Sequence, residues 1–425
     1  MTKKRPSKVS SWAPALVLVG APLIFIGVAN CKGGGAASGD SQPNAGDDGG
    51  DGADALADGS QGTGPFAATV VAAGMCTGID TDGRIVGLDP PTSVPAAMPR
   101  AVSDEFGGID ETSLPNIFRI GTDGKKTALS LPKAAGLPVL PIGEWRLPSP
   151  RLRGGKLLGL GQAMYADLSR GCSPGPGCGG APRGNAAPLL THDTWSSIPI
   201  AGDVILAYVA GASSTGAMVG AYRVDNPPDD GGTPESTASE GGAHDVPFLV
   251  VDGKITVLEG GDAVALDINT NGDIVGKSAF DDFSRAVQWK GTKATKLDAE
   301  ARNSVALAIN DKGQAVGAVQ GSDQEPRAAL FAGGSVTLIR PLGDERSVAH
   351  AITAAGTVVG QAAVKGTAHA FVWENGVTTD LNPKDANGDA FATSTVTDVT
   401  ADGRMAVGNG VTAQGAVVCV KWVRK

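Results

Sequence analysis

The sequence predicts an all-β fold, a seven-bladed β-propeller of four-stranded blades, from three observations. First, pairs of glycines four residues apart recur along the chain, as in Gly272–Gly276, Gly313–Gly317 and Gly356–Gly360. Second, an Asp, Asn, Ser or Thr stands three residues before the first glycine of nearly every pair, where its side chain can close a local turn. Third, a strand and a further glycine turn follow most pairs. Repeats of about 40–45 residues with room for four strands are typical of propeller blades.

The clearest unit is residues 261–297, which reads as four short strands. The strands expected are Ala263–Ile268, Ile274–Gly276, Arg285–Trp289 and Ala294–Leu297. Glycine at position 272 suits the first turn, because glycine adopts positive φ without steric cost. A unit of this size cannot bury its faces alone, so it requires neighbouring copies.

Seven glycine frames give the blade count. They are Gly83–Gly87, Gly155–Gly159, Gly216–Gly220, Gly272–Gly276, Gly313–Gly317, Gly356–Gly360 and Gly403–Gly408, the last with one extra residue. Leu152 breaks the turn-residue pattern of the second frame. The blades are expected at about 74–131, 140–201, 203–259, 262–300, 302–343, 345–390 and 391–425. The last unit has no room for a fourth strand, so Phe66–Ala73 is expected to complete it and close the ring, which removes exposed edges.

Residues 349–373, with His369-Ala-Phe371, resemble the HAF-type extracellular repeat. The match extends over residues 262–382, whereas residues 66–260 match only at the glycine frames. The resemblance implies an extracytoplasmic repeat domain with a propeller fold. It brings no catalytic residues, because that family has no well-defined set to carry over.

The N-terminal residues 1–31 read as a targeting segment. Basic residues precede an apolar run, Trp12–Ala29, and Cys31 closes it. This order resembles a bacterial lipoprotein signal and implies lipidation of Cys31 and an outer-membrane lipoprotein of the cell envelope, on the periplasmic side or the cell surface. Asn30 stands where a small residue is usual, so an uncleaved N-terminal anchor is the alternative. Residues 32–65 are rich in Gly, Ala and Asp and predict a disordered acidic linker before the folded domain, 66–425.

The net charge of the chain indicates which classes of binding partner are expected. The formal net charge is −9, and four basic residues belong to the targeting segment, so nucleic acid is not expected as a partner. We expect a monomer that contacts the membrane through its N-terminal lipid.

Of five cysteines, Cys172 and Cys178 are close enough in sequence for a local disulfide. Cys76 and Cys419 lie in the first and last blades, where they form either a bridge that locks the ring or two buried thiols.

The sequence contains no recognisable catalytic motif, metal-binding histidine pattern or phosphate loop. His350 and His369 occupy positions that repeat with other residue types, which favours structural roles. One oxygen-rich turn is a calcium candidate, with ligands Asp267, Asn269, Asn271 and Asp273. A hairpin turn explains the same residues, and no cofactor is otherwise implied. The segment Asp385–Asp389 is likewise either a calcium candidate or a hairpin turn.

Three long insertions, Leu88–Asn116, Leu160–Pro188 and Tyr222–Pro247, are each expected between the second and third strands of a blade. Loops in that position would emerge on one face of the ring, where function tends to be located. Their candidate contact residues are Arg100, Asp104, Tyr165, Arg170, Asp229 and Asp230. The sequence therefore predicts a non-enzymatic binding or scaffolding module for a protein or glycan partner. The alternative is a hydrolase or lyase with a site at the central channel.

Overall fold

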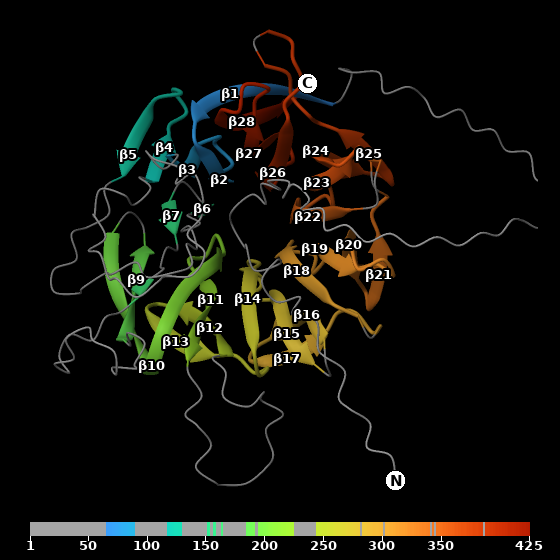
Figure 1. The fold of residues 1–425 in the computed structure, drawn as a ribbon. Coiled ribbons are helices and arrows are strands. Elements are labelled where there is room, and N and C mark those ends of the chain that lie inside the picture. Colours follow the sequence, from blue (N-terminus) through green and yellow to red (C-terminus); the bar gives the residue numbers. More distant parts are fainter. Residues whose placement is uncertain are drawn as a thin grey trace, which may run out of the picture.

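A computed structural model describes residues 65–89, 117–129, 151–153, 156–158, 163–164, 184–191, 194–224, 244–280, 283–300, 302–340, 342–343, 346–385 and 387–425. The described residues form six β-sheets arranged in a ring around a central axis (Figure 1). The all-β propeller class is confirmed, but the predicted count of seven blades is wrong, because the structure has six.

Five of the sheets have four antiparallel strands each. The first contains β2 (Met75–Ile79), β3 (Ile85–Leu88), β4 (Ile117–Ile120) and β5 (Lys126–Leu129). The next contains β14 (Ala263–Ile268), β15 (Ile274–Phe280), β16 (Phe283–Lys290) and β17 (Lys293–Lys296). It is followed by β18 (Ser304–Ile309), β19 (Ala315–Gln320), β20 (Pro326–Ala332) and β21 (Ser335–Leu338), and by β22 (Ser347–Ile352), β23 (Val358–Val364), β24 (Thr367–Glu374) and β25 (Val377–Asp380). The last contains β26 (Thr393–Val399), β27 (Met405–Val411), β28 (Val417–Arg424) and β1 (Phe66–Ala73).

The remaining sheet has eight strands and explains the error in the count. Its blade is β10 (Thr194–Ala212), β11 (Met218–Val224), β12 (His244–Val251) and β13 (Lys254–Val257). The region expected to be a separate blade at 140–201 instead extends this sheet through β6 (Arg151–Arg153), β7 (Lys156–Leu158), β8 (Ala163–Met164) and β9 (Gly184–Thr191). Strand β10 is long enough to pair with β9 over Thr194–Pro199 and with β11 over Val204–Ala212. Lys156–Leu158, the residues between the two glycines of the second frame, therefore belong to the added strands, and this is the frame whose turn pattern Leu152 breaks.

The first described strand closes the ring. Strand β1 pairs antiparallel with β28, from Phe66 opposite Arg424 to Ala73 opposite Val418. The chain then passes through Gly74 into β2, the inner strand of the first blade. The last blade is thus built from both ends of the described chain, which lie beside each other in Figure 1.

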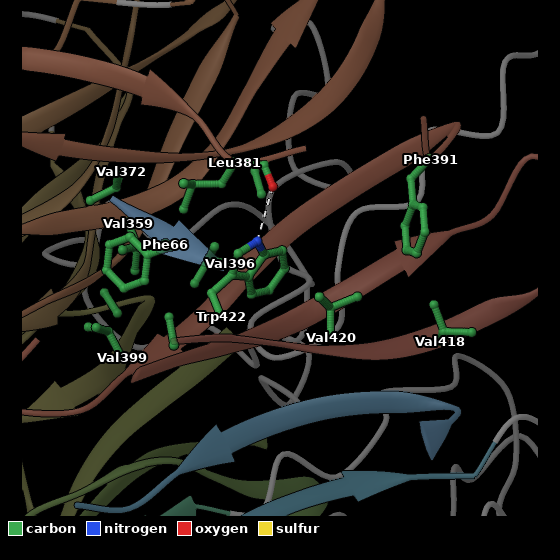
Figure 2. Close-up of a cluster of buried hydrophobic side chains, with 13 residues drawn as sticks. Phe66, Val359, Val372, Leu381, Phe391, Val396, Val399, Val418, Val420 and Trp422 are labelled. Atoms are coloured by element: carbon green, nitrogen blue, oxygen red, sulfur yellow. Dashed lines mark hydrogen bonds between the residues drawn. The ribbon is translucent and has the colours of Figure 1, made fainter. Parts of the chain in front are cut away.

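Each blade is buried at its inner strand and exposed at its outer one. Every residue of β14 is buried, whereas β17 has only one half-buried residue among four. Between neighbouring blades, side chains form continuous apolar clusters. Figure 2 shows one between the last two blades, in which Phe66, Val359, Val372 and Trp422 pack together. Burying aromatic side chains of this size stabilises the fold by about 1.5–3 kcal/mol each.

The two glycines of a frame serve different purposes. Gly313 has φ of 74°, so it supplies the left-handed turn between β18 and β19. Gly317 lies opposite a β-bulge, where the register shifts between Ala306 and Ala308. A Cβ atom on Gly317 would lie 2.0 Å from the carbonyl oxygen of Val305. The four-residue spacing of the glycines therefore results from a turn that is followed by a close approach of two backbones.

Among the residues that the structure describes, no helix is long and apolar enough to span a membrane. The targeting segment, 1–31, and the linker, 32–64, lie outside the described residues.

Candidate functional site

The β-bulge recurs in every inner strand and places one extra residue per blade at the same position. In the register, the skipped residues are Thr77, Ala210, Leu266, Leu307, His350 and Thr397. Inner strands surround the axis of a propeller, so this set marks the central channel. Bulges redirect a side chain and are common near functional sites.

The channel has an apolar half and a polar half. Ala210, Leu266 and Leu307 join one buried apolar cluster with residues of β11, β19 and β22. The polar half comes from the last two blades and the first. We call Thr77, His350, Gln361, Thr397 and Asn409 the polar arc; Gln361 and Asn409 occupy matching positions on β23 and β27.

The polar arc is centred on the seam between the last blade and the first. Asn409 accepts a hydrogen bond from the backbone N–H of Cys76 at 2.6 Å and donates one to the Cys76 carbonyl at 3.1 Å. Thr397 donates its hydroxyl to the same carbonyl at 3.0 Å. The carboxylate of Asp398 accepts the backbone N–H of Ile79 at 3.0 Å. These side chains therefore hold the two blades together.

A disulfide between Cys76 and Cys419 joins the same two blades, with Cα atoms 5.1 Å apart and a sequence separation of 343. Both cysteines are fully buried. The pair thus connects β2 to β28, and of the two possibilities that the sequence left open, the structure contains the bridge.

The other seams show why this one differs. At three of them a serine on the next inner strand accepts a backbone N–H from the preceding blade, and these bonds are Ala286 to Ser304, Ala328 to Ser347 and Ala370 to Ser394. In the register, Cys419 takes the place of the three alanines and Gly74 takes the place of the serines. Gly74 has φ of 103°, a conformation that serine rarely adopts. The closing seam therefore uses a disulfide and Asn409 instead of a serine.

The residues of the calcium candidate are occupied by hydrogen bonds within the protein. Asn269 accepts the backbone N–H groups of Asn271 and Asp273 at 3.0 and 2.9 Å, and its amide donates to the Asn310 carbonyl of the next blade at 3.0 Å. Asp267 accepts the N–H of Ile309 at 3.0 Å, again across a seam. Within the described residues there is no group of three or more His, Cys, Asp or Glu side chains that could hold a metal ion. The geometry is that of a turn and a connection between blades.

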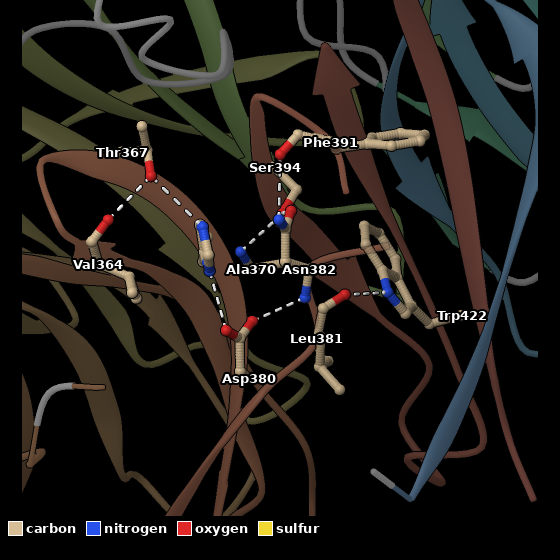
Figure 3. A network of polar contacts seen from close by, with 10 residues as sticks. Val364, Thr367, Ala370, Asp380, Leu381, Asn382, Phe391, Ser394 and Trp422 are labelled. Carbon is tan, nitrogen blue, oxygen red and sulfur yellow. Dashed lines mark hydrogen bonds and ion pairs between the residues drawn. The ribbon is translucent and has the colours of Figure 1, made fainter. Parts of the chain in front are cut away.

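A second polar network lies between the last two blades, on the outer side of the serine bridge (Figure 3). His369 Nδ1 lies 2.8 Å from Asp380 Oδ2, and the other oxygen of Asp380 accepts the N–H of Asn382 at 2.7 Å. Ser394 donates to Asn382 Oδ1 at 2.6 Å. The hydroxyl of Thr367 lies 3.4 Å from His369 Nε2.

The order hydroxyl, histidine, carboxylate is that of a nucleophile, a base and the group that orients the base. Here, however, the Thr367 hydroxyl donates to the Val364 carbonyl at 2.8 Å, so its proton is directed away from His369. The tight turn between β23 and β24 holds Thr367 in this position, because Lys365 and Gly366 both have positive φ. The network is therefore arranged to fix β24 against β25 and β26.

Charged groups also hold β28, the strand that closes the ring. Glu374 on β24 forms an ion pair with Arg424, and the Thr357 hydroxyl donates to it at 3.0 Å. The hydrogen bond from Arg424 is the main cause that lowers the pKa of Glu374. Arg424 also lies over the ring of Phe66, 4.7 Å from its centroid, and so connects β1, β28 and the preceding blade.

Several residues singled out by the sequence lie outside the described residues, and the structure therefore does not place them. They are Cys31, Cys172, Cys178, Arg100, Asp104, Tyr165, Arg170, Asp229 and Asp230. The insertion between β3 and β4 and the one between β11 and β12 do separate the second and third strands of a blade. The middle insertion, Leu160–Pro188, does not, because it lies among the added strands of the eight-stranded sheet.

Sequence reasoning missed the polar groups that join the blades: Asn409, Asp398, and the serines at 304, 347 and 394. The serines could have been found by aligning the repeats, since they stand at the same distance before each frame. Asn409 follows the second glycine of its frame, where the other blades have Leu88, Ala221, Lys277, Ala318 and Gln361, so no repeated residue type indicated its role.

No family model matches the chain, and no curated protein matches it. Among solved structures, it is similar to the β-propeller domain of the Trilobed protease from Pyrococcus furiosus, with 12% identity and a TM-score of 0.44, over 73% of this chain and 84% of that one. An acylaminoacyl peptidase from Pyrococcus horikoshii matches at 10% identity and a TM-score of 0.47, over 82% of this chain and 50% of the peptidase. TolB from Acinetobacter baumannii matches at 10% identity and a TM-score of 0.34, over 73% and 76% of the chains. At this distance the similarity concerns the propeller fold alone, and the resemblance to the HAF-type repeat stays a prediction.

Proposed function

We propose that this chain is an extracytoplasmic propeller, tethered to a bacterial envelope membrane through Cys31, whose long loops hold a protein or glycan partner. The observation that carries the proposal is the distribution of loop lengths on the ring. Four blades join their second and third strands by short connections, as between Phe280 and Phe283 or Val364 and Thr367. The first blade and the β10–β13 blade have long connections there, between Leu88 and Ile117 and between Val224 and His244. Long loops on a rigid frame are where binding residues concentrate.

The polar groups at the seams support a scaffold role. Asn409 uses both amide atoms of its side chain between blades, and Asp267 and Asp398 accept backbone N–H groups of the next blade. These side chains hold the ring in shape. A buried disulfide between Cys76 and Cys419 favours an oxidising compartment, because cytosolic proteins keep their thiols reduced.

Exchanging the long loops tests the binding role. In one variant a Lys-Gly turn, as at positions 365 and 366, replaces residues 89–116, and in another it replaces 225–243. The matched control replaces the short connection 321–325. Cells that produce each variant are treated with a protein cross-linker, and the adducts are identified by mass spectrometry. The wild type and the control should give the same adducts. At least one loop variant that folds normally should lack them. Adducts that persist unchanged in both folded loop variants would place the partner elsewhere.

The tether is tested separately. Cys31→Ser should release the protein from the membrane fraction, because a lipid chain on that cysteine is the proposed attachment. If the variant stays in the membrane fraction and its N-terminal peptide is still detected, an uncleaved anchor is the attachment instead.

A hydrolase is the second candidate, and the order Thr367, His369 and Asp380 is the only observation behind it; the Thr367 hydroxyl would have to turn from the Val364 carbonyl toward His369 before it could act. The test is hydrolysis of an activated ester by the purified protein. His369→Ala should abolish turnover while His350→Ala, at the channel, retains it. If the two variants have equal rates, the network between β24 and β25 has no catalytic role.

A further inference from the structure

Strand β1 differs from the outer strands of the other blades. Strand β1 is eight residues long, Phe66–Ala73, and none of these residues is charged. The outer strands of the other blades, β5, β13, β17, β21 and β25, are four residues long. Ala67, Ala68, Thr69 and Val70 are all exposed, and Val70 retains 46% of its accessible surface. Figure 1 shows β1 at the outer rim of the ring, beside β28. A long uncharged edge strand is a template for pairing with another strand.

The hydrogen bonds around β1 show which of its backbone groups face outward. Arg424 donates its N–H to Arg404, away from β1, and Lys425 donates its N–H to the carbonyl of Pro65. In an antiparallel pair the residues alternate between those bonded to the partner and those turned away. Phe66 is opposite Arg424, so the N–H and C=O groups of Phe66, Ala68 and Val70 are directed outward.

The charge pattern indicates which strand fits this edge. Two identical strands that pair antiparallel about a twofold axis place residues of the same strand opposite one another, so a strand that carries charges of one sign repels its copy. Four of the other outer strands carry a lysine or an aspartate: Lys126, Lys254, Lys293 with Lys296, and Asp380. Strand β1 carries none. The charged groups at its two ends are already paired, Glu374 with Arg424 near Phe66, and Asp89 with Lys126 near Ala73.

From these observations we propose that β1 is a dimerisation edge, on which β1 of a second copy of this chain pairs antiparallel about a twofold axis. Ala68 lies at the axis, and Phe66 of each copy is opposite Val70 of the other. The two closing blades then form one continuous sheet. This interaction surface is independent of the proposed partner-binding loops, and it departs from the monomer that the sequence predicts. A single pair of short strands buries less area than a standard interface, so dimerisation should depend on concentration.

Sedimentation of the purified chain over a wide concentration range tests the dimer. We expect the wild type to shift from monomer to dimer as its concentration rises. Ala68→Pro removes an outward N–H and leaves the bonds to β28, so it should remain monomeric with an unchanged unfolding midpoint. Thr69→Pro is the matched control, because it removes an inward N–H and should lower that midpoint. Val70→Lys adds a charge to the edge and should also give a monomer, which keeps the test valid if Ala68→Pro does not fold.

Cross-linking tests the register. Paired residues that exchange both backbone bonds have Cα atoms about 5.5 Å apart, within the range for a disulfide. Ala68→Cys should therefore give a disulfide-linked dimer under mild oxidation, and Thr69→Cys, displaced from the axis, should give much less. A wild type that stays monomeric at every concentration overturns the proposal, as does a dimer that persists in both Ala68→Pro and Val70→Lys. Equal cross-linking at positions 68 and 69 overturns the register.

Discussion

Replacing Cys76 and Cys419 together with alanine removes the covalent link at the closing seam while keeping both positions filled. Alanine is the residue that the repeats place there: Ala306 and Ala349 match Cys76, and Ala328 and Ala370 match Cys419. The substitution should therefore leave little cavity. The main loss is the constraint that the disulfide imposes on the unfolded chain.

The size of that loss follows from the length of the closed loop. The two cysteines are 343 residues apart, and a chain-entropy estimate for a loop of that length is about 6 kcal/mol. Removal of native disulfides typically costs about 2–5 kcal/mol, so we expect the free energy of unfolding to fall within that range. The seam would still be held by Asn409, Asp398 and the pairing of β1 with β28.

Guanidinium unfolding followed by tryptophan fluorescence measures the effect, because Trp422 lies on the strand that carries Cys419. The wild type should lose stability when reductant is added, and the double variant should not respond to it. A control with Cys172→Ala and Cys178→Ala should keep the response of the wild type. A double variant as stable as the oxidised wild type would refute the reasoning, as would two free thiols at 76 and 419 in the native protein.

Three further predictions concern the frames and the seams. Gly317→Ala should destabilise the protein by several kcal/mol more than Gly313→Ala does. A Cβ atom at position 313 meets no atom within 4 Å, so that variant carries only the cost of positive φ, about 1–2 kcal/mol. Thermal unfolding of both variants measures the difference. Asn409→Ala removes the partner of the buried Cys76 N–H, while the Cys76 carbonyl keeps the Thr397 hydroxyl, and it should cost about 1–3 kcal/mol in denaturant unfolding. A loss below about 0.5 kcal/mol would show that water replaces the amide. The pKa of Glu374 is lowered in the folded state, so its pair with Arg424 stabilises the protein above the ordinary Glu value of 4.5, and that contribution, about 0.2–1 kcal/mol, is lost as pH falls through the lowered value. Glu374→Gln should therefore flatten the fall in stability at acid pH, and an unchanged pH profile would contradict this assignment.

The propeller class could be predicted from the sequence because two steric requirements recur at a fixed distance. A turn with positive φ and a backbone contact too close for a Cβ atom both require glycine, as at Gly313 and Gly317. Such a pattern is local, so no knowledge of neighbouring blades is needed to recognise it. The closure of the last blade by β1 followed from a similar local fact, the absence of a fourth strand after Trp422.

The blade count failed because a glycine pair alone does not specify a blade. Gly155 and Gly159 have the spacing, but Leu152 cannot close the preceding turn through a side-chain hydrogen bond. Whether such a segment forms its own sheet depends on which strand it pairs with, and here that strand is β10, through β9. This pairing is a long-range choice that the sequence pattern of the segment does not determine.

The contacts between blades were unpredictable for a different reason. Three of the six seams use a serine, and the closing seam uses a disulfide with an asparagine. Equivalent positions therefore hold residues that share no chemistry, such as Ala328 and Cys419. Only the register of the strands shows that they are equivalent.

The position of the polar arc has a structural explanation that bears on function. The channel is polar at the last blades and the first, and the ring closes at the same place. Thr397 and Asn409 both direct hydrogen bonds to the backbone of Cys76, the residue that also forms the disulfide. A catalytic site at the channel would need such groups directed toward a substrate, but here the geometry directs them toward the neighbouring blade. Two of the five residues of the polar arc, Thr397 and Asn409, therefore serve the closure of the ring, in keeping with the proposal that the ring is a frame and its loops make the contacts.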